Sequence, residues 1–319
     1  MQNRKLGNTP FSIAPLVFGG NVFGWTIDER RSFELLDAFV DAGFNMIDTA
    51  DSYSRWVSGH QGGESETIIG RWIAKRGRHD DVIIATKVGS DMGLGYRCLR
   101  KDYILQEAEQ SLRRLQVDCI DLYQSHWDDE KTPFEETLEA YDTLIRAGKV
   151  RAIGASNLNA ARLKQALEAS KAKGLPRYDT LQPRYNLYDR SEFEGGLQDL
   201  CVRENIGVIT YYSLAAGFLT GKYRSEADFG KSQRGARMSK YLDARGKRIL
   251  AALDEVSRDM GATPAQVALA WLLSRPGVTA PIASATSVEQ LQEITAGAQL
   301  ELSSAAIRKL DSASAEEKS

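Results

Sequence analysis

The alternation of short apolar runs with helix-periodic stretches constrains this chain more than any other feature. Most neighbouring apolar runs are separated by a stretch with the apolar spacing of an amphipathic helix. Such alternation implies parallel strands, since a parallel pair needs a long crossover connection. Eight units over roughly 250 residues fit a (β/α)8 barrel better than an open sheet. The strand-like runs lie near residues 15–19, 44–47, 82–86, 119–123, 150–154, 180–182, 206–210 and 279–283.

An open, doubly wound Rossmann-type sheet is the alternative. Its dinucleotide fingerprint needs three glycines between the first strand and helix. The Gly93-Leu94-Gly95 run lacks the third glycine and stands elsewhere in the chain. We therefore predict an α/β fold, a (β/α)8 TIM barrel that forms a single domain over residues 1–319. A β-hairpin at residues 3–14, turning at Asn8-Thr9-Pro10, is expected to plug one end of it.

Start and stop signals predict several helix boundaries. Between the seventh and eighth strands, residues 213–239 form a long irregular segment rich in Gly, Ser, Lys and Arg, and we predict a long loop plus an extra helix there. A loop of this length in a compact domain usually has a function. The predicted helices include Glu29–Ala42 after Asp28, Phe134–Ala147 after Pro133, Ala160–Lys173 after Asn159, Tyr241–Met260, Pro264–Ser274 and Ser303–Ala313.

Composition excludes several classes of partner. The net charge of -2, from 41 basic and 43 acidic residues, gives no net field to attract nucleic acid or an anionic membrane. Neither a signal peptide nor a membrane span is expected, and Met1 stands only a few residues before the hairpin. Three cysteines without paired spacing favour a reducing, cytoplasmic setting. The partner we expect is a small molecule, and the composition leaves the oligomeric state undetermined.

Polar side chains follow three neighbouring strands at the point where each strand ends. Asp48 and Tyr53 follow the second, Lys87 the third and His126 the fourth. Each alone has an ordinary reading, as a turn, packing or surface residue. Active sites of barrels lie at the C-terminal ends of the strands, so joint placement there indicates a catalytic site. The Lys87 ammonium should pair with Asp48 and make the Tyr53 phenol more acidic, while His126 can hold a substrate oxygen or relay a proton.

Metal binding is not predicted, because His60, His79 and His126 form no cluster with cysteine or carboxylate at ligand spacing. A P-loop is not predicted either. The run from Gly217 to Lys222 has the wrong spacing and is followed by Tyr223 in place of Ser or Thr.

These residues stand within motifs that resemble the aldo-keto reductase superfamily, to which the potassium-channel β subunits are related. The resemblance covers nearly the whole chain. It is carried by Gly43-Phe44-Asn45-Met46-Ile47-Asp48-Thr49-Ala50-Asp51-Ser52-Tyr53, Gly63-Glu64-Ser65-Glu66, Ala85-Thr86-Lys87, Gln124-Ser125-His126, Gly154-Ala155-Ser156-Asn157, Leu181-Gln182-Pro183-Arg184-Tyr185-Asn186 and Tyr212-Ser213-Leu214-Ala215-Ala216-Gly217-Phe218-Leu219-Thr220-Gly221-Lys222-Tyr223.

The resemblance implies a role for each site residue. Tyr53 would be the general acid, tuned by Lys87 and Asp48, while His126 would orient the carbonyl. The nicotinamide carboxamide would be held by Ser156, Asn157 and Gln182, and its ring would stack on Tyr212. Residues implied to contact the pyrophosphate are Ser213, Leu214, Gly217, Lys222 and Arg234. Without the resemblance, Ser156 and Asn157 read as a strand-end cap, Gln182 as a core hydrogen bond, and Lys222 and Arg234 as solvated charges.

The cofactor's 2'-phosphate would face residues Ser284, Thr286 and Gln290. Many relatives carry Lys or Arg in this segment, whereas hydroxyls and one amide stand here. We expect NADP(H) to be preferred, with NAD(H) as the alternative. The substrate is expected to meet an aromatic-walled pocket formed by Trp25, Trp56 and Trp127, although packing between loops is the competing reading for each.

Three functions are compatible with this sequence. The favoured one is a carbonyl reductase that reduces an aldehyde or ketone to an alcohol, or runs the reverse reaction. The second is a nicotinamide-binding regulatory subunit with slow or vestigial redox activity. The third is a metal-free barrel lyase or isomerase, which titration with NADPH would separate from the first two.

Overall fold

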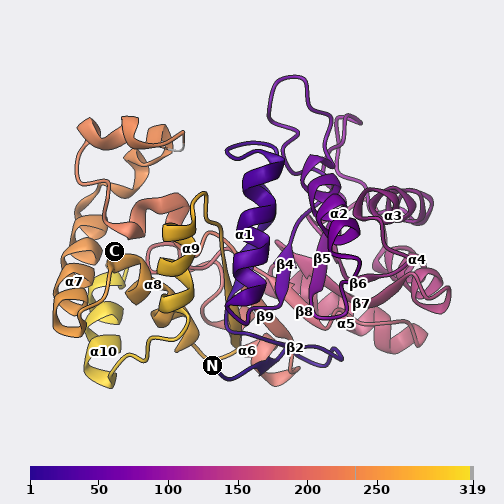
Figure 1. Ribbon diagram of the computed structural model, residues 1–319. Helices are drawn as coiled ribbons and strands as arrows, with labels where there is room; N and C mark the ends of the chain where they lie inside the picture. The colour runs from indigo at the N-terminus through magenta and orange to yellow at the C-terminus, as the bar shows by residue number, and fades with distance from the viewer. Residues whose placement is uncertain (234, 317–319) are drawn as a thin grey trace.

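Eight parallel strands close into a barrel in the computed structural model, which describes residues 1–233 and 235–316 (Figure 1). Around the barrel the strand order is β10-β3-β4-β5-β6-β7-β8-β9, so chain neighbours pair and the last strand closes on the first. This confirms the predicted (β/α)8 fold. The strands are β3 (Val17–Gly19), β4 (Met46–Asp48), β5 (Ile83–Val88), β6 (Ile120–Ser125), β7 (Val150–Ser156), β8 (Thr180–Gln182), β9 (Gly207–Thr210) and β10 (Val278–Ala283).

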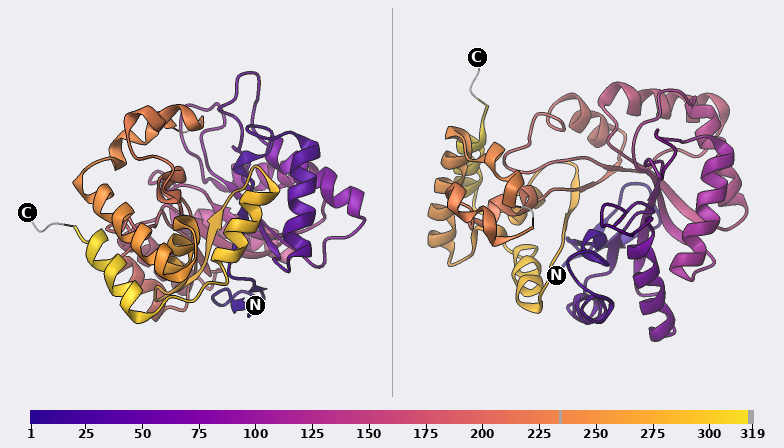
Figure 2. Two further views of the ribbon diagram at one scale, coloured as in Figure 1. Left: turned by 60° about the vertical axis from the view of Figure 1, so that its left-hand side comes forward. Right: turned by 90° about the horizontal axis from the view of Figure 1, so that it is seen from above.

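Helices surround this barrel, as the view from above shows (Figure 2). Asp28 and Asn159 cap their helices as predicted, accepting hydrogen bonds from the amides of Arg31 at 2.8 Å and Arg162 at 2.9 Å. The helices are α1 (Glu29–Asp41), α2 (Glu64–Arg76), α3 (Lys101–Leu115), α4 (Phe134–Arg146), α5 (Ala160–Lys173), α6 (Gly196–Arg203), α7 (Ala244–Met260), α8 (Pro264–Leu273), α9 (Val288–Gly297) and α10 (Ser304–Ser314), with a short 3-10 helix η1 (Gly20–Val22) after β3.

The interior divides into two apolar layers because side chains alternate along each strand. One layer fills the space between the strands and the helices, and it includes Tyr123 of β6. The other fills the barrel itself with inward-facing residues such as Met46, Leu122 and Ile209. A filled barrel leaves its C-terminal rim as the place for chemistry.

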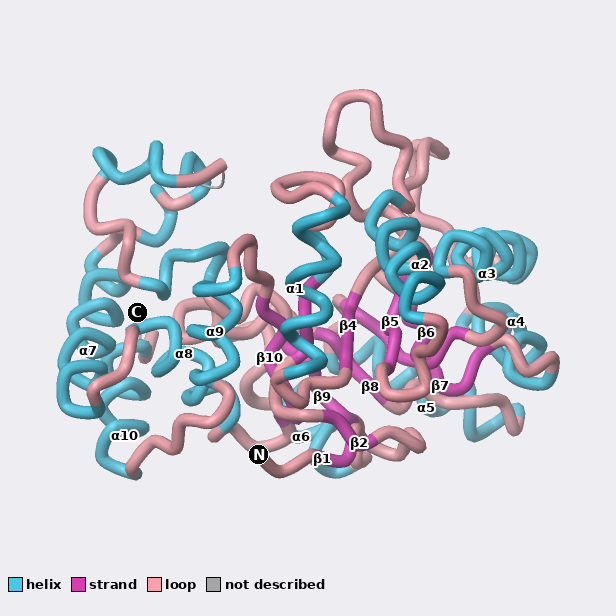
Figure 3. Tube along the Cα trace, in the orientation of Figure 1, coloured by secondary structure: helices cyan, strands magenta, loops and turns pink. Residues whose placement is uncertain are grey.

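The N-terminal hairpin closes the opposite end of the barrel, which confirms the predicted plug. Strands β1 (Arg4–Lys5) and β2 (Ser12–Ile13) pair antiparallel, and Leu6 and Phe11 join the inner apolar layer. Close backbone approach requires Gly7 there, since its φ is +53° and an added Cβ would lie 2.4 Å from the Asp179 carbonyl oxygen. Figure 3 shows β1 and β2 at the end opposite the long loops.

The segment after β9 differs in detail from the prediction. Residues expected to be irregular form short 3-10 helices, namely η2 (Ala215–Thr220), η3 (Glu226–Lys231), η4 (Gly235–Arg237) and η5 (Ser239–Tyr241). The extra helix α7 begins at Ala244 rather than Tyr241, because the Asp243 carboxylate accepts a hydrogen bond from the Gly246 amide at 2.7 Å and so caps it. Within the described ranges, none of the helices is long and apolar enough to span a membrane.

Candidate active site

The Lys87 ammonium is the centre of a buried polar cluster at the C-terminal rim. Strand β5 is buried along its whole length, and the Lys87 side chain is fully buried. The ammonium donates to Asp48 Oδ2 at 2.7 Å, to the Thr49 carbonyl at 2.7 Å and to the Tyr53 hydroxyl at 3.0 Å. Three donors thus meet three acceptors, which compensates for the burial of this charge. The predicted pairing of Lys87 with Asp48 is present.

Asp48 is fixed from several directions at the end of β4. Its Oδ1 accepts hydrogen bonds from the amide groups of Gln182 at 2.8 Å and Gln124 at 3.3 Å. The Tyr53 hydroxyl donates to Oδ2 at 3.3 Å, beside Lys87. Gln182 therefore makes a core hydrogen bond, and its amide points at the carboxylate of the tetrad formed by Asp48, Tyr53, Lys87 and His126.

The Tyr53 phenol is held in its protonated form. Burial raises the pKa of Tyr53 well above its usual range, and the negative charge of Asp48 raises it further. The net direction of the Tyr53 pKa is therefore opposite to the more acidic phenol predicted from the sequence. Burial and Asp48 set the direction here, while desolvation also lowers the pKa of Lys87 itself.

His126 follows β6 and is held as a neutral imidazole. Its Nδ1 lies 2.9 Å from the Ser90 hydroxyl and 3.5 Å from the Ser52 hydroxyl. Burial lowers the pKa of His126 well below its usual range, and the positive charges of Lys87 and Arg97 lower it further. The ring centroid lies 6.0 Å from that of Tyr53. A neutral imidazole beside a protonated phenol suits hydrogen bonding to one shared oxygen atom.

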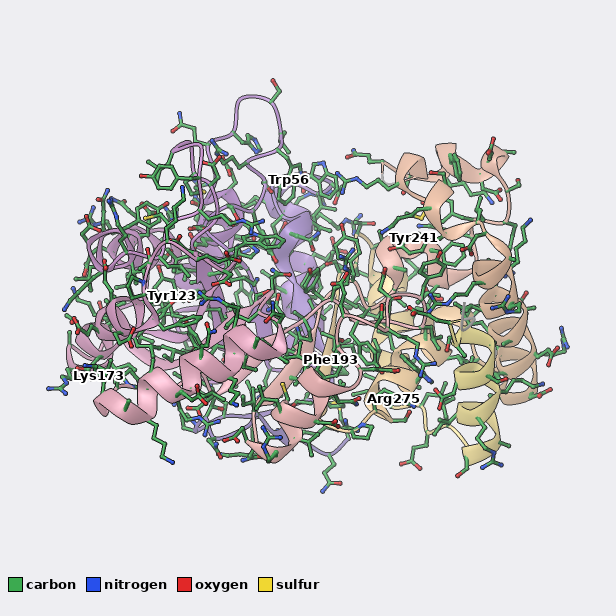
Figure 4. All side chains as sticks on the ribbon, turned by 180° about the vertical axis from the view of Figure 1, so that it is seen from behind. Trp56, Tyr123, Lys173, Phe193, Tyr241 and Arg275 are labelled. Carbon is green, nitrogen blue, oxygen red and sulfur yellow. The ribbon has the colours of Figure 1, made fainter. Side chains whose placement is uncertain are left out.

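The three predicted tryptophans gather around Tyr53 and His126. Trp25 meets Trp56 edge to face at 5.4 Å, and Trp56 lies 6.2 Å from the Tyr53 ring. Trp127 stacks on His126 at 5.9 Å with an interplanar angle of 14°. Trp56 remains 52% exposed and lies near the upper end of the molecule in Figure 4. The three tryptophans therefore lie at the candidate active site.

Ser156, Asn157 and Tyr212 lie on the ends of the next strands around the rim. Asn157 donates through Nδ2 to the His126 carbonyl at 2.9 Å and to the Ser156 hydroxyl at 3.0 Å. Ser156 donates in turn to the Gln182 carbonyl at 2.8 Å. Tyr212 is 39% exposed, so its ring is available to a ligand.

Four further polar residues at the site were not predicted as site residues from the sequence. Tyr211 donates to Asn157 Oδ1 at 2.6 Å, and Gln124, Ser52 and Ser90 contact Asp48 or His126. A signal existed for Gln124, because it stands two residues after an inward-facing position of β6 and so shares its face. No local pattern marks Tyr211, whose partner Asn157 directly follows another strand, β7.

The loop after β9 brings Ser213, Leu214, Gly217 and Lys222 to the same rim. The Lys222 side chain lies against Gly217, where an added Cβ would come within 3.4 Å of the Lys222 Cε atom. Gly217 has a φ of +103°, and Tyr212, Ala215 and Ala216 also adopt positive φ values. Strained backbone of this kind clusters at ligand-binding sites. Arg234, the fifth predicted residue of this group, lies outside the described residues.

The polar groups of the segment before α9 form hydrogen bonds with other groups of the protein. Ser284 donates to the Gly19 carbonyl and to Asn21 Oδ1, both at 2.7 Å. Thr286 donates through its amide and hydroxyl to Gln290 Oε1 at 2.9 and 3.0 Å. The first turn of α9 also carries the acidic Glu289. The predicted residues are therefore together, with hydroxyls and an amide but no cation among them.

Other places in the molecule carry less chemistry. Across residues 1–233 and 235–316, no group of three or more His, Cys, Asp or Glu side chains is arranged to hold a metal ion. A surface hollow of about 610 Å³ lies at the hairpin end, lined by residues such as Phe11, Asp121 and Arg151. Its Arg151 and Asp121 pair at 2.7 Å. We place the candidate site at the opposite rim, where the buried Lys87 cluster lies.

A barrel with a buried lysine–carboxylate pair, a phenol and an imidazole at its rim defines a class of oxidoreductase, and comparison with known sequences agrees. The profile described as "Aldo/keto reductase family" matches residues 15–315, and the chain belongs to this family. Its members generally use nicotinamide cofactors.

Three relatives are each similar over nearly the whole chain. The uncharacterized oxidoreductase YrpG of Bacillus subtilis (strain 168) is 35% identical, covering 98% of this chain and 95% of its own length. Protein tas of Escherichia coli (strain K12) is 32% identical, and the match covers 95% of this chain and 94% of its own length. A probable voltage-gated potassium channel subunit beta of Arabidopsis thaliana is 32% identical, and the match covers 92% of this chain and 90% of its own length.

Proposed function

We propose that this protein is an NADP(H)-dependent oxidoreductase that reduces an aldehyde or ketone to an alcohol, or catalyses the reverse reaction. The observation that carries the proposal is the Lys87 ammonium, which contacts Asp48 Oδ2 at 2.7 Å and the Tyr53 hydroxyl at 3.0 Å. A protonated phenol beside a buried cation can release its proton to a developing alkoxide, because the cation stabilises the phenolate that remains.

The other tetrad residues support this transfer. Asp48 balances the charge of Lys87, and its own position is fixed by Gln124 and Gln182. His126 is neutral, so it acts by orienting the carbonyl oxygen toward Tyr53 rather than by supplying the proton. The nicotinamide, when bound, supplies the hydride. Tyr53 is therefore the general acid for reduction and the general base for oxidation.

The residues around the rim fit a nicotinamide dinucleotide. The exposed face of Tyr212 suits stacking on a flat ring, and Ser156 and Asn157 offer short polar groups for a carboxamide. The backbone carbonyl of Gln182 accepts a hydrogen bond from the Ser156 hydroxyl and so fixes its position. Gly217 leaves a place that a Cβ would fill, with Lys222 beside it, which suits a pyrophosphate oxygen. We assign the pyrophosphate to Ser213, Leu214, Gly217, Lys222 and Arg234, and the substrate to Trp25, Trp56 and Trp127.

Mixing the purified protein with NADPH and an aldehyde tests the proposal. We expect a change in NADPH fluorescence on binding and loss of absorbance on addition of 4-nitrobenzaldehyde or another member of a carbonyl panel. Binding without turnover across aldehydes, ketones and sugars would instead favour a regulatory subunit. The similarity to the plant channel subunit supports that second candidate. Absence of NADPH and NADH binding would refute both.

The preference for NADP(H) over NAD(H) should be modest. Only hydroxyls and an amide stand at positions 284, 286 and 290, and a neutral hydrogen bond contributes about 0.5–1.5 kcal/mol, against about 1.5–3 kcal/mol for one to a charged group. Thr286→Arg should therefore raise the ratio of dissociation constants for NADH and NADPH, with Thr286→Gln as the neutral control. Wild-type preference for NADH would overturn the cofactor assignment. An equal ratio in Thr286→Arg would show that position 286 does not meet the phosphate.

We also propose a cytoplasmic location. Cys98, Cys119 and Cys201 are free thiols, as expected in a reducing compartment.

A further inference from the structure

Arg97 is a cation beside the candidate active site whose charge is not explained by the fold. It lies in the loop between β5 and α3, and its side chain is exposed. The guanidinium stacks on the Trp127 ring, 4.2 Å from the ring centroid. Trp127 in turn stacks on His126, so the charge lies one indole ring away from the imidazole.

The loop between β5 and α3, which carries Arg97, contains one acidic residue, Asp91. Asp91 Oδ1 accepts hydrogen bonds from the Gly93 amide at 2.9 Å and the Gly95 amide at 3.0 Å, which shapes its own loop. The Asp91 backbone carbonyl accepts a hydrogen bond from Arg55 at 2.8 Å. Among the residues that the structure describes, no carboxylate forms an ion pair with Arg97.

We propose that Arg97 binds an anionic group on the substrate, and that the preferred substrates are flat, aromatic carbonyl compounds carrying a carboxylate or a phosphate. This inference rests on the proposed function, and it names the substrate class of that site. A substrate ring lying beside the edge of Trp127 would extend from His126, where the carbonyl is oriented, to Arg97. Stacking on an aromatic ring leaves the guanidinium edge free to form two parallel hydrogen bonds with such an anion.

The chemistry of the surroundings favours the same class. Trp25 and Trp56 lie beside Tyr53, and Trp56, which is 52% exposed, offers aromatic surface to a planar ring. Lys87 cannot serve the anion, because it is fully buried and uses its donors on Asp48, Thr49 and Tyr53. The anion would therefore be recognised at Arg97, away from the tetrad.

Three aldehydes of similar shape test this assignment with NADPH as the reductant. 4-Carboxybenzaldehyde and 4-formylphenyl phosphate carry the two kinds of anion, and 4-nitrobenzaldehyde is a neutral counterpart of the carboxylate. In Arg97→Gln, the ratio of kcat/KM for an anionic aldehyde to that for 4-nitrobenzaldehyde should fall on the order of tenfold, as for loss of a charged hydrogen bond. The compound with the larger fall identifies the anion. Arg97→Lys should retain part of the preference, and added salt should weaken it in the wild type.

Arg100→Gln is the matched control, since Arg100 is an exposed arginine of the same loop that pairs with Asp102 at 3.5 Å. It should leave the ratio unchanged. An equal fall for all three aldehydes in Arg97→Gln would overturn the inference, because it would mean that Arg97 only supports Trp127. An unchanged ratio would overturn it as well.

Calorimetric binding of 4-carboxybenzaldehyde to the protein saturated with NADP⁺ separates this inference from the proposed function. Weaker binding to Arg97→Gln than to Arg100→Gln supports the anion site even if no aldehyde is reduced. Turnover of 4-nitrobenzaldehyde together with equal binding to both variants would refute the anion site and leave the reductase standing.

Discussion

Tyr53→Phe is expected to reduce turnover by at least 10²–10⁴-fold, the range roughly associated with loss of a general acid. Phenylalanine keeps the ring beside Trp56 and His126 and removes only the hydroxyl that contacts Lys87 and Asp48. Binding of NADPH should change little, because the proposed cofactor contacts follow other strands. Steady-state kinetics and a fluorescence titration of NADPH measure the two effects. Near-normal turnover would remove Tyr53 from its role.

The pH dependence of the wild-type enzyme offers a check that is independent of mutation. Because burial and Asp48 raise the pKa of Tyr53, the phenol stays protonated, and kcat for reduction should be flat from about pH 6 to about pH 9. His126, whose pKa burial lowers, should add no inflection near its ordinary value of 6.5. Loss of activity as the pH rises through 6.5 would instead point to an imidazolium as the acid.

The barrel itself was open to prediction because its signals are local. Each strand is a short apolar run, capping residues such as Asp28 and Asn159 mark several helix starts, and the strand ends place Asp48, Lys87 and His126 at one rim. The 3-10 helices after β9 were not predicted, since they depend on packing around a loop without periodicity. The true start of α7 depended on which polar residue, Asp243, became the cap.

The site was predictable as a set of residues but only partly as a network. A sequence can suggest that Lys87 seeks Asp48, because both follow buried strands. It cannot show that Tyr211 donates to Asn157 or that Ser90 contacts His126, since these partners come from different strands and loops. The direction of the Tyr53 pKa is a balance of burial against neighbouring charges. That balance depends on distances that the sequence does not contain.

Lys87→Met is expected to reduce turnover strongly and also to destabilise the protein. Methionine has a similar length but no charge, so Tyr53 loses the cation that would stabilise its phenolate. Asp48 would remain buried without its counter-charge, and breaking a buried pair from one side costs about 3–5 kcal/mol. Denaturant unfolding measures the change in stability, and steady-state kinetics measure the change in turnover. A folded variant with unaltered activity and pH profile would contradict the coupling of Lys87 to Tyr53.

The double variant Asp48→Asn with Lys87→Met separates the two effects of this lysine. With both charges replaced by neutral groups, no unpaired charge is buried, so most of the lost stability should return. Turnover should stay low, because Tyr53 still lacks its cation. Recovery of turnover in the double variant would mean that Lys87 acts only by neutralising Asp48.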